Sequence, residues 1–295
     1  MSVSVVLASV GRKIALIDVL KDLSEQTLAI SQVVISTPKA EDAPELAAIP
    51  EALRPAVTYV TGVLGNSAQR NAGCHALRPT DYIAFFDDDS RVHREYLEQA
   101  VGFLQSVRDA AGLEGVVIKD GAAIGREVSS AEATSLLHDF LDSDRNVTSV
   151  VKLYGCNFVV RSSLIADLSF DERLPLYGWL EDLDYSRQLL KRGRLFRLHS
   201  AAIVHRGISS GGRKAHRRFG YSQVANPVYL RSKGSISWRE LTVFLIKGLP
   251  NNAVASAIGP DRRGHYRRVC GNLIAVRDFS VGRLDPARIT ELRLD

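Results

Sequence analysis

Apolar residues in the first 120 positions alternate between short β-branched or aromatic runs and stretches with helical spacing. The short runs predict strands over residues 3–8, 32–36, 57–60, 82–86 and 115–118. The helical spacing predicts helices over residues 13–23 and 94–107, and a polar cap at Asn66 or Ser67 predicts the start of another. This alternation indicates an α/β fold with a central, mostly parallel sheet flanked by helices.

The pattern is less regular in the second half of the chain. It predicts a strand over residues 150–160, a helix over residues 179–192, and two short strands over residues 195–204 about a turn at Ser200. A further helix is expected over residues 236–249, with Trp238, Leu241, Phe244 and Leu245 on one side. We therefore divide the sequence into a domain of residues 1–206 and a basic, largely helical C-terminal extension of residues 207–295.

Three consecutive carboxylates, Asp87, Asp88 and Asp89, follow the buried strand 82–86. Ligands of open α/β sheets bind outside the carboxyl ends of the strands. Clustered carboxylates repel one another unless a hard cation such as Mg²⁺ or Mn²⁺ bridges them, so a metal that holds a diphosphate is the natural partner. The alternative is a solvated turn that caps the helix expected near His93, because Asp is a common helix cap.

A second acidic cluster, Glu181, Asp182 and Asp184, follows Trp179 at the start of a helix. The face of a Trp ring stacks on the apolar face of a sugar, and a carboxylate at a helix start can accept a proton from a hydroxyl group. The alternative is favourable helix-start chemistry alone, because acids at the start and bases at the end of a helix complement its dipole.

Several single residues occupy positions that suit a ligand. Ser9 and Arg12 lie in the loop after the first strand, where a nucleotide could bind. Arg70, in a helix's first turns, could reach a phosphate or a base, although an exposed helical arginine is the commoner outcome. Gly155 allows close backbone approach. His205, at a strand end, is a candidate third metal ligand, although most lone histidines bind no metal.

Composition favours an ordinary globular protein in a reducing compartment. Of the 295 residues 45% are hydrophobic and 24% charged, which disfavours disorder. The three cysteines are widely spaced and include no CxxC pair, which argues against both a disulfide framework and a zinc site. The N-terminus reads as a strand and not a signal peptide, and the apolar stretch 241–249 ends at Pro250, too short to span a membrane. A cytoplasmic location is expected.

Charge is unevenly distributed along the chain. Residues 206–295 contain 17 Lys and Arg against 6 Asp and Glu, whereas residues 1–205 contain 21 against 27. The extension is therefore expected either to grip phosphates or to lie on the inner, anionic face of a membrane, where the helix over 236–249 would attach. A helix packed on the body of the protein is the alternative. Nucleic acid is disfavoured, because the basic residues form no recognisable binding motif.

The order of these motifs resembles the inverting family-2 glycosyltransferases with the GT-A fold. The resemblance covers roughly residues 3–206 and is carried by the first strand, by Arg70-Asn71-x-Gly73, by the strand that ends in three Asp residues, and by Trp-x-Glu-Asp at 179–182. It implies a GT-A nucleotide-binding sandwich. It also implies transfer of a sugar from a nucleotide-diphosphate sugar to a hydroxyl of a saccharide or lipid-linked acceptor, in the synthesis of a cell-surface polysaccharide or glycolipid.

The resemblance also implies a role for each candidate residue. Asp89 would coordinate a divalent metal, Mn²⁺ or Mg²⁺, with His205 approaching the same ion. Asp87 and Asp88 would lie near the ribose and the donor sugar, and Gly155 would border that sugar. Ser9, Arg12 and Arg70 would match nucleotide-binding positions. Asp182 would be the general base, with Trp179 and Glu181 at the acceptor.

The chain departs from the family where the nucleobase binds. Many relatives carry an acidic pair after the second strand, whereas residues 34–38 offer the hydroxyls of Ser36 and Thr37. One alternative is a nucleotidyltransferase of related fold, which would need a glycine-rich, lysine-bearing phosphate loop that residues 10–13 match poorly. Another is a non-catalytic sugar-binding or nucleotide-binding subunit of an envelope-assembly complex, which predicts a lost acid in one cluster.

Overall fold

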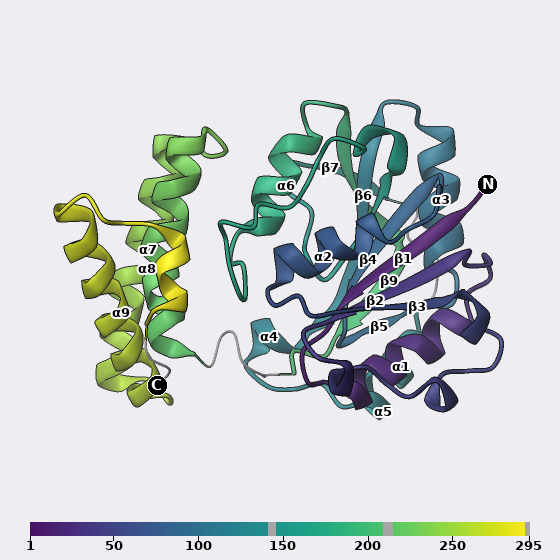
Figure 1. The fold of residues 1–295 in the computed structure, drawn as a ribbon, viewed down its shortest axis with the longest axis horizontal. Coiled ribbons are helices and arrows are strands. Elements are labelled where there is room, and N and C mark those ends of the chain that lie inside the picture. The colour runs from purple at the N-terminus through teal and green to yellow at the C-terminus, as the bar shows by residue number, and fades with distance from the viewer. Residues whose placement is uncertain (141–145, 209–214, 293–295) are drawn as a thin grey trace. The chain divides into compact units, whose positions relative to one another are not determined.

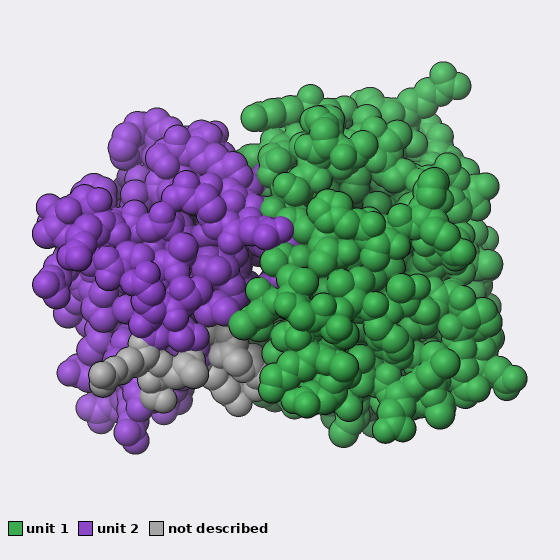
Figure 2. Space-filling model, viewed as in Figure 1, with its two compact units in different colours: residues 1–64, 68–170, 185–209 green, residues 65–67, 171–184, 210–295 purple. Residues whose placement is uncertain are grey.

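The computed structural model describes residues 1–140, 146–208 and 215–292 (Figure 1). The chain divides into two compact units (Figure 2). Unit 1 comprises Met1–Leu64, Ala68–Phe170 and Tyr185–Ser209, and unit 2 comprises Gly65–Ser67, Asp171–Asp184 and Ser210–Asp295. Unit 2 thus includes two short segments from within residues 1–206, and the domain boundary at residue 206 stays a prediction.

Unit 1 is built on a nine-stranded sheet with the order β3-β2-β1-β4-β8-β6-β9-β5, and β7 pairs with β9. The strands are β1 Val3–Ala8, β2 Gln32–Thr37, β3 Val57–Thr61, β4 Tyr82–Asp87, β5 Ser90–Val92, β6 Ala110–Asp120, β7 Val147–Val150, β8 Asn157–Arg161 and β9 Arg194–His205. The pairings give β1, β2, β3, β4, β6 and β9 one direction, and β5, β7 and β8 the other. The expected mostly parallel sheet is confirmed.

Helices cover both faces of this sheet (Figure 1). The helices of residues 1–205 are α1 Lys13–Ser24, α2 Asn66–His75, α3 Tyr96–Ser106, α4 Gly121–Ile124, α5 Ser130–His138 and α6 Glu181–Leu189. Alternate residues of each strand point to opposite faces. Val5 and Leu7 of β1 therefore pack with α1 and α3, whereas Val6 packs with the other cluster, which holds Tyr185 of α6.

The sequence-based expectations for unit 1 are wrong in three places. The strand expected over residues 150–160 is limited to β8, Asn157–Arg161, because β7 already ends at Val150. The chain over Arg194–His205 forms one strand, β9, although its register with β6 shifts between Leu198 and Ala202, next to the turn expected at Ser200. The short strand β5 was not predicted, because three residues are too few to give a pattern. It begins directly after Asp89, so the acids lie in a tight β4–β5 turn.

Unit 2 is mainly helical, as expected for the extension. Its helices are α7 His216–Lys233, α8 Trp238–Ile258 and α9 Arg262–Ser280, followed by a 3₁₀ turn over Pro286–Thr290. Ser237 and Glu240 form a reciprocal capping box at the start of α8. The core includes Tyr221, Val224 and Ala275, buried between α7 and α9.

Helix α8 differs from the expected helix in length and in the side that it buries. It continues through Pro250 to Ile258, so the expected end of the helix at residue 249 is wrong. Pro250 is exposed, so water can bind the carbonyl whose hydrogen bond the proline removes. Leu241, Phe244 and Leu245 pack into the core of unit 2. Within the described part of the chain, α8 is the single helix that is long and apolar enough to cross a membrane, judged by length and composition alone.

Candidate active site

The carboxyl ends of four strands of unit 1 share one edge of the sheet, because β1, β4, β6 and β9 run in the same direction. Ala8 at the end of β1 is in register with Asp87, the last residue of β4. Asp120 at the end of β6 is in register with His205, the last residue of β9. The sheet thereby brings Asp87, Asp120 and His205, which are far apart in the sequence, to the edge where α/β sheets bind ligands.

Of the three acids at the β4–β5 turn, Asp88 and Asp89 are buried, whereas the side chain of Asp87 is 34% exposed. Asp88 and Asp89 are each only 2% exposed, and the amide of Arg206 donates a hydrogen bond of 3.0 Å to the carbonyl of Asp89. Helix α3 begins at Tyr96, with Glu95 at the N-cap and no side-chain cap. The interpretation of the acids as a solvated turn that caps this helix is therefore wrong.

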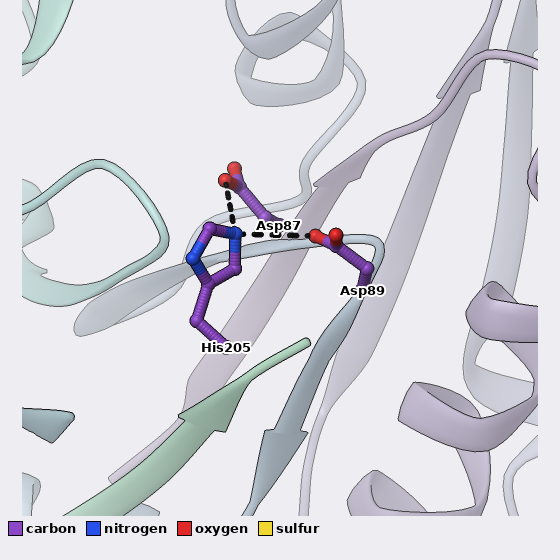
Figure 3. A group of neighbouring side chains, drawn as sticks. All are labelled: Asp87, Asp89 and His205. Carbon is purple, nitrogen blue, oxygen red and sulfur yellow. Dashed lines mark ion pairs between the residues drawn. The ribbon is translucent and has the colours of Figure 1, made fainter. Parts of the chain in front are cut away.

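Asp87, Asp89 and His205 converge on one point (Figure 3). His205 Nε2 lies 3.4 Å from Asp89 Oδ1 and 3.8 Å from Asp87 Oδ2. The three ligand atoms lie within 4.8 Å of one another, close to the separations of at most about 4.2 Å that an ion bound at about 2.1 Å by each atom would produce. Asp89 Oδ1 is buried and has no hydrogen-bond partner among the described residues. Two carboxylates and an imidazole therefore fit a divalent cation such as Mn²⁺ or Mg²⁺.

Two residues that the sequence did not single out orient His205. Asp120 Oδ1 lies 2.8 Å from His205 Nδ1, and the hydroxyl of Tyr154 donates to Asp120 Oδ2 at 2.7 Å. This carboxylate–histidine arrangement fixes the ring, as it does in known metal sites. Asp120 was missed because the predicted strand ended at residue 118, and nothing local distinguishes this carboxylate from a surface acid.

Burial and neighbouring charges shift the pKa values of the site residues in opposite directions. Burial lowers the pKa of His205, but the hydrogen bond with Asp120 and the carboxylates of Asp89 and Asp87 raise it to about 10 overall. Burial raises the pKa of Asp89, but His205 and Arg12 lower it by more than burial raises it. The pKa of Asp89 is therefore below its ordinary value. Without a metal, the imidazolium therefore balances the carboxylates, and a cation that binds Nε2 would replace its proton.

The loop after β1 closes on the same acids. Ser9 donates a hydrogen bond of 2.6 Å to Asp88 Oδ2, and Arg12 lies 3.0 Å from Asp88 and 3.1 Å from Asp89. Burial raises the pKa of Asp88, and Arg12 only partly offsets the shift. Gly11, with a φ of +67°, allows the turn that brings Arg12 to the start of α1. Ser9 and Arg12, both predicted, thus contact the acidic turn directly.

Arg70 lies inside unit 1 and not on an exposed helix face. Its side chain is held by hydrogen bonds from Nη2 to Asp87 Oδ1 at 3.0 Å and to the carbonyl of Gly155 at 2.7 Å. Its guanidinium also lies over the rings of Phe158 and Phe170. With only 1% of Arg70 exposed, the arrangement suits orientation of Asp87 more than direct contact with a ligand.

Hydroxyls at the end of β2 are buried, as is an amide that the sequence did not single out. Gln69 of α2 donates hydrogen bonds to the carbonyls of Ser9 and Ser36, at 3.0 and 2.7 Å, and so ties β1 to β2. Ser36 Oγ is buried with no hydrogen-bond partner among the described residues. A polar side chain in a predicted helix carries no signal that it points inward, which is why Gln69 escaped notice.

In unit 2 the second acidic cluster separates into structural and accessible members. Glu181 accepts a hydrogen bond of 2.8 Å from Asn66 and is 6% exposed. Asp184 is fully buried and accepts hydrogen bonds from Lys233 and Ser235. Asp182 is half-buried. Of these three acids, Asp182 is therefore the one with accessible surface.

The approach to Asp182 is conformationally strained and aromatic. Leu176 and Leu180 have φ values of +59° and +75°, a left-handed backbone that costs a leucine about 1 kcal/mol or more. Such outliers cluster at functional sites. Trp179, between them in the chain, is half-buried and packs edge-on against Phe219 and Phe244 within unit 2.

The structure brings one group of predicted site residues together within unit 1: Ser9, Arg12, Arg70, Asp87, Asp88, Asp89, Gly155 and His205. Trp179, Glu181 and Asp182 belong to unit 2. The functional roles of all eleven residues remain predictions.

Residues 82–231, just over half of the chain, match the model of glycosyl transferase family group 2. The chain therefore belongs to this family and is a glycosyltransferase. The predicted family is confirmed. No curated protein sequence matches the chain.

Solved structures of TarS from S. aureus share the fold. The crystal structure of TarS residues 1–349 has a TM-score of 0.52 at 14% identity and covers 96% of this chain and 92% of that chain. The same fragment in complex with UDP-GlcNAc has a TM-score of 0.51 at 14% identity, covering 96% and 93%. A longer TarS structure gives 0.52 at 14% identity, with 96% of this chain and 50% of that chain covered. This likeness confirms the predicted GT-A fold.

The orientation of His205 by Asp120 can be tested on metal binding alone. Asp120→Asn should weaken Mn²⁺ binding about 10- to 100-fold, because the amide lacks the charge that fixes and polarises the imidazole. Tyr154→Phe should cause a smaller loss in the same direction. Isothermal titration calorimetry with Mn²⁺ measures both.

Asp139→Asn is the matched control, since Asp139 is an exposed carboxylate at the end of α5. It should leave the Mn²⁺ affinity unchanged. Wild-type affinity in a folded Asp120→Asn protein would show that Asp120 does not orient a metal ligand.

Proposed function

We propose that this glycosyltransferase transfers a sugar from a nucleotide-diphosphate sugar to a hydroxyl group of a saccharide or lipid-linked acceptor, with metal dependence and with inversion at the anomeric carbon. The observation that carries the proposal is the convergence of Asp87, Asp89 and His205 at the carboxyl ends of β4 and β9, with Asp89 Oδ1 buried and without a hydrogen bond to any described residue. TarS, which shares the fold, has been crystallised with UDP-GlcNAc. That likeness supports a donor of the same class.

Donor binding is assigned to unit 1. Asp89 and His205 would hold the cation, with Asp87 beside them, and a bound divalent ion would neutralise the charge that develops on the leaving diphosphate. Arg12 already faces the acids at 3.0–3.1 Å and would supply a second positive charge near the phosphates. Asp88, oriented by Ser9, would meet the ribose or the donor sugar. Arg70 would position Asp87 and Gly155.

Acceptor activation is assigned to Asp182. The acceptor oxygen attacks the anomeric carbon, the bond from that carbon to the phosphate oxygen breaks, and the acceptor proton passes to the Asp182 carboxylate. Attack opposite the leaving group inverts the anomeric centre in one displacement, so no enzyme nucleophile is needed. Trp179 would stack on the acceptor. Glu181 could contribute directly only if its hydrogen bond with Asn66 opened.

Two alternative functions are disfavoured, and the proposal also includes a cellular role. Membership of a glycosyltransferase family favours glycosyl transfer over nucleotidyl transfer. A non-catalytic subunit would have lost an acid, and both acidic clusters are complete. The proposed role is in cell-surface polysaccharide or glycolipid synthesis in the cytoplasm, with the basic extension of residues 207–295 in peripheral contact with the membrane that carries a lipid-linked acceptor.

The function is tested by a screen of nucleotide sugars for Mn²⁺-dependent binding and hydrolysis. One donor should bind with metal, and Asp89→Ala should abolish the metal-dependent part of the affinity. Asp89 also accepts a hydrogen bond from the amide of Ile208, so Asp89→Asn, which keeps the shape of the side chain, is the companion variant. Asp139→Asn again serves as the control. Donor affinity that changes neither on removal of Mn²⁺ nor in the Asp89 variants would contradict the proposal.

The general base is tested separately. Asp182→Asn keeps the shape of the side chain but removes its basicity, so transfer should fall by roughly 10²-fold or more while donor affinity survives. Asp184→Asn, at a fully buried acid two residues on, should instead lower thermal stability. A folded Asp182→Asn enzyme that binds donor and transfers sugar at the wild-type rate would remove Asp182 from the mechanism.

A further inference from the structure

The solvent-facing side of α8 is an apolar stripe. Ile246 and Ile258 are 64% and 81% exposed, and Val243 and Val254 are also exposed. Pro250 lies between them in the same row. Their spacing of three or four residues places these side chains along one side of the helix. The opposite side, with Leu241 and Asn252, is buried in unit 2.

The stripe is long and contains no charge of its own. From Val243 to Ile258 it extends over 15 residues, roughly 22 Å of helix at 1.5 Å per residue. Lys247 is the charged residue within these positions, and Arg239 lies near the helix start. Glu240, the acid of α8, is engaged in the capping box with Ser237. Contiguous exposed apolar surface of this kind marks an interaction site.

Positive charge and aromatic rings accompany the stripe. Arg262 and Arg263, both exposed, follow Ile258 at the start of α9, and Tyr266 on the next turn is 63% exposed. At the other end of α8, Trp238 is 67% exposed. Apolar side chains flanked by Arg, Lys, Trp and Tyr are typical of a helix that lies in the interface of an anionic bilayer.

The charge of the extension favours a membrane over a second copy of the chain as the partner that covers the stripe. Residues 206–295 contain 17 basic residues against 6 acidic ones, so two copies that met through this region would repel each other. An anionic lipid surface would instead attract it, by an amount that grows with each basic residue near the headgroups. The observations therefore favour lipid over a second copy.

Buried polar contacts indicate that α8 lies on the surface of a membrane and does not cross it. The side chain of Asn252 donates hydrogen bonds to Gln223 of α7 at 2.7 Å and to Asn272 of α9 at 3.0 Å. A helix that left its neighbours to enter the hydrocarbon would carry this amide unsatisfied, which is costly. The packed side thus keeps α8 in unit 2 while the stripe stays outward.

We propose that the exposed stripe of α8, formed by Val243, Ile246, Pro250, Val254 and Ile258, is a monotopic docking surface for an anionic phospholipid bilayer. Arg239, Lys247, Arg262 and Arg263 provide the contacts to the headgroups. The inference rests on the proposed membrane contact of the extension, and it specifies the surface that makes it. It differs from the sequence-based expectation, since the apolar side expected to attach is the one that is packed.

The test is flotation of the full-length protein with vesicles of phosphatidylcholine alone or of phosphatidylcholine mixed with phosphatidylglycerol. The wild-type protein should float with the mixed vesicles at low salt and less at high salt. Ile246→Glu combined with Ile258→Glu should reduce flotation by roughly tenfold or more, because each change puts a negative charge into the stripe. Arg262→Ala with Arg263→Ala should reduce the preference for phosphatidylglycerol.

Ile14→Glu is the matched control, since Ile14 on α1 is as exposed as Ile258 but lies in unit 1. It should float like the wild type. Ile246→Ser with Ile258→Ser serves if the glutamate variant does not fold. Absence of wild-type flotation on anionic vesicles at low salt would overturn the inference, as would equal loss in Ile14→Glu. A dimer in sedimentation velocity that the stripe variants dissociate would show that a second copy covers the stripe.

Transfer to a water-soluble acceptor analogue, measured on the same proteins, separates this inference from the proposed function. Normal transfer without vesicle binding overturns the docking surface alone. Vesicle binding that depends on the stripe supports the docking surface even when no transfer is found. The absence of transfer counts against the proposed function alone.

Discussion

The close approach of three carboxylates at the end of one strand, two of them buried, is the constraint on which the rest of unit 1 depends. Charges this close repel one another and resist removal from water unless positive groups compensate them. Arg12, Arg70 and His205 supply that compensation from three distant parts of the sequence. The loop after β1, the start of α2 and the end of β9 must therefore all reach the β4–β5 turn, and the sheet order places them there.

Close backbone approach at the ends of β6 and β9 serves the same purpose. A Cβ atom on Gly121 would lie 2.0 Å from the carbonyl of Arg206, and one on Gly207, whose φ is +68°, would lie 2.3 Å from the amide of Ala122. Glycine at both positions lets the two strand ends meet, so that Asp120 reaches His205. Arg206, held by Asp18 and Glu127, anchors the chain directly after the histidine.

The parts of the structure that could be predicted are those encoded locally. Strand β1 over Val3–Ala8 and the start of α1 at Lys13 match the predictions, because apolar periodicity sets them. The acidic cluster is visible in the sequence, although only the fold shows that β5 follows it and that Asp88 and Asp89 are buried. Asp120 and Gln69 escaped prediction because their importance lies in partners 85 and 60 residues away. In α6 the resemblance singled out Asp182, but the sequence could not predict the burial of Glu181 and Asp184, since tertiary contacts with Asn66 and Lys233 set it.

The central claim is that the edge formed by β4, β6 and β9 is a divalent metal site used in glycosyl transfer. The most direct measurement is an anomalous difference map at the manganese absorption edge, from crystals grown with Mn²⁺ and a nucleoside diphosphate. The account predicts one strong peak about 2.0–2.4 Å from Asp89 Oδ1 and His205 Nε2, with diphosphate oxygens completing the coordination. A nucleoside diphosphate bound in unit 1 with no manganese peak beside Asp89 and His205 would contradict the account.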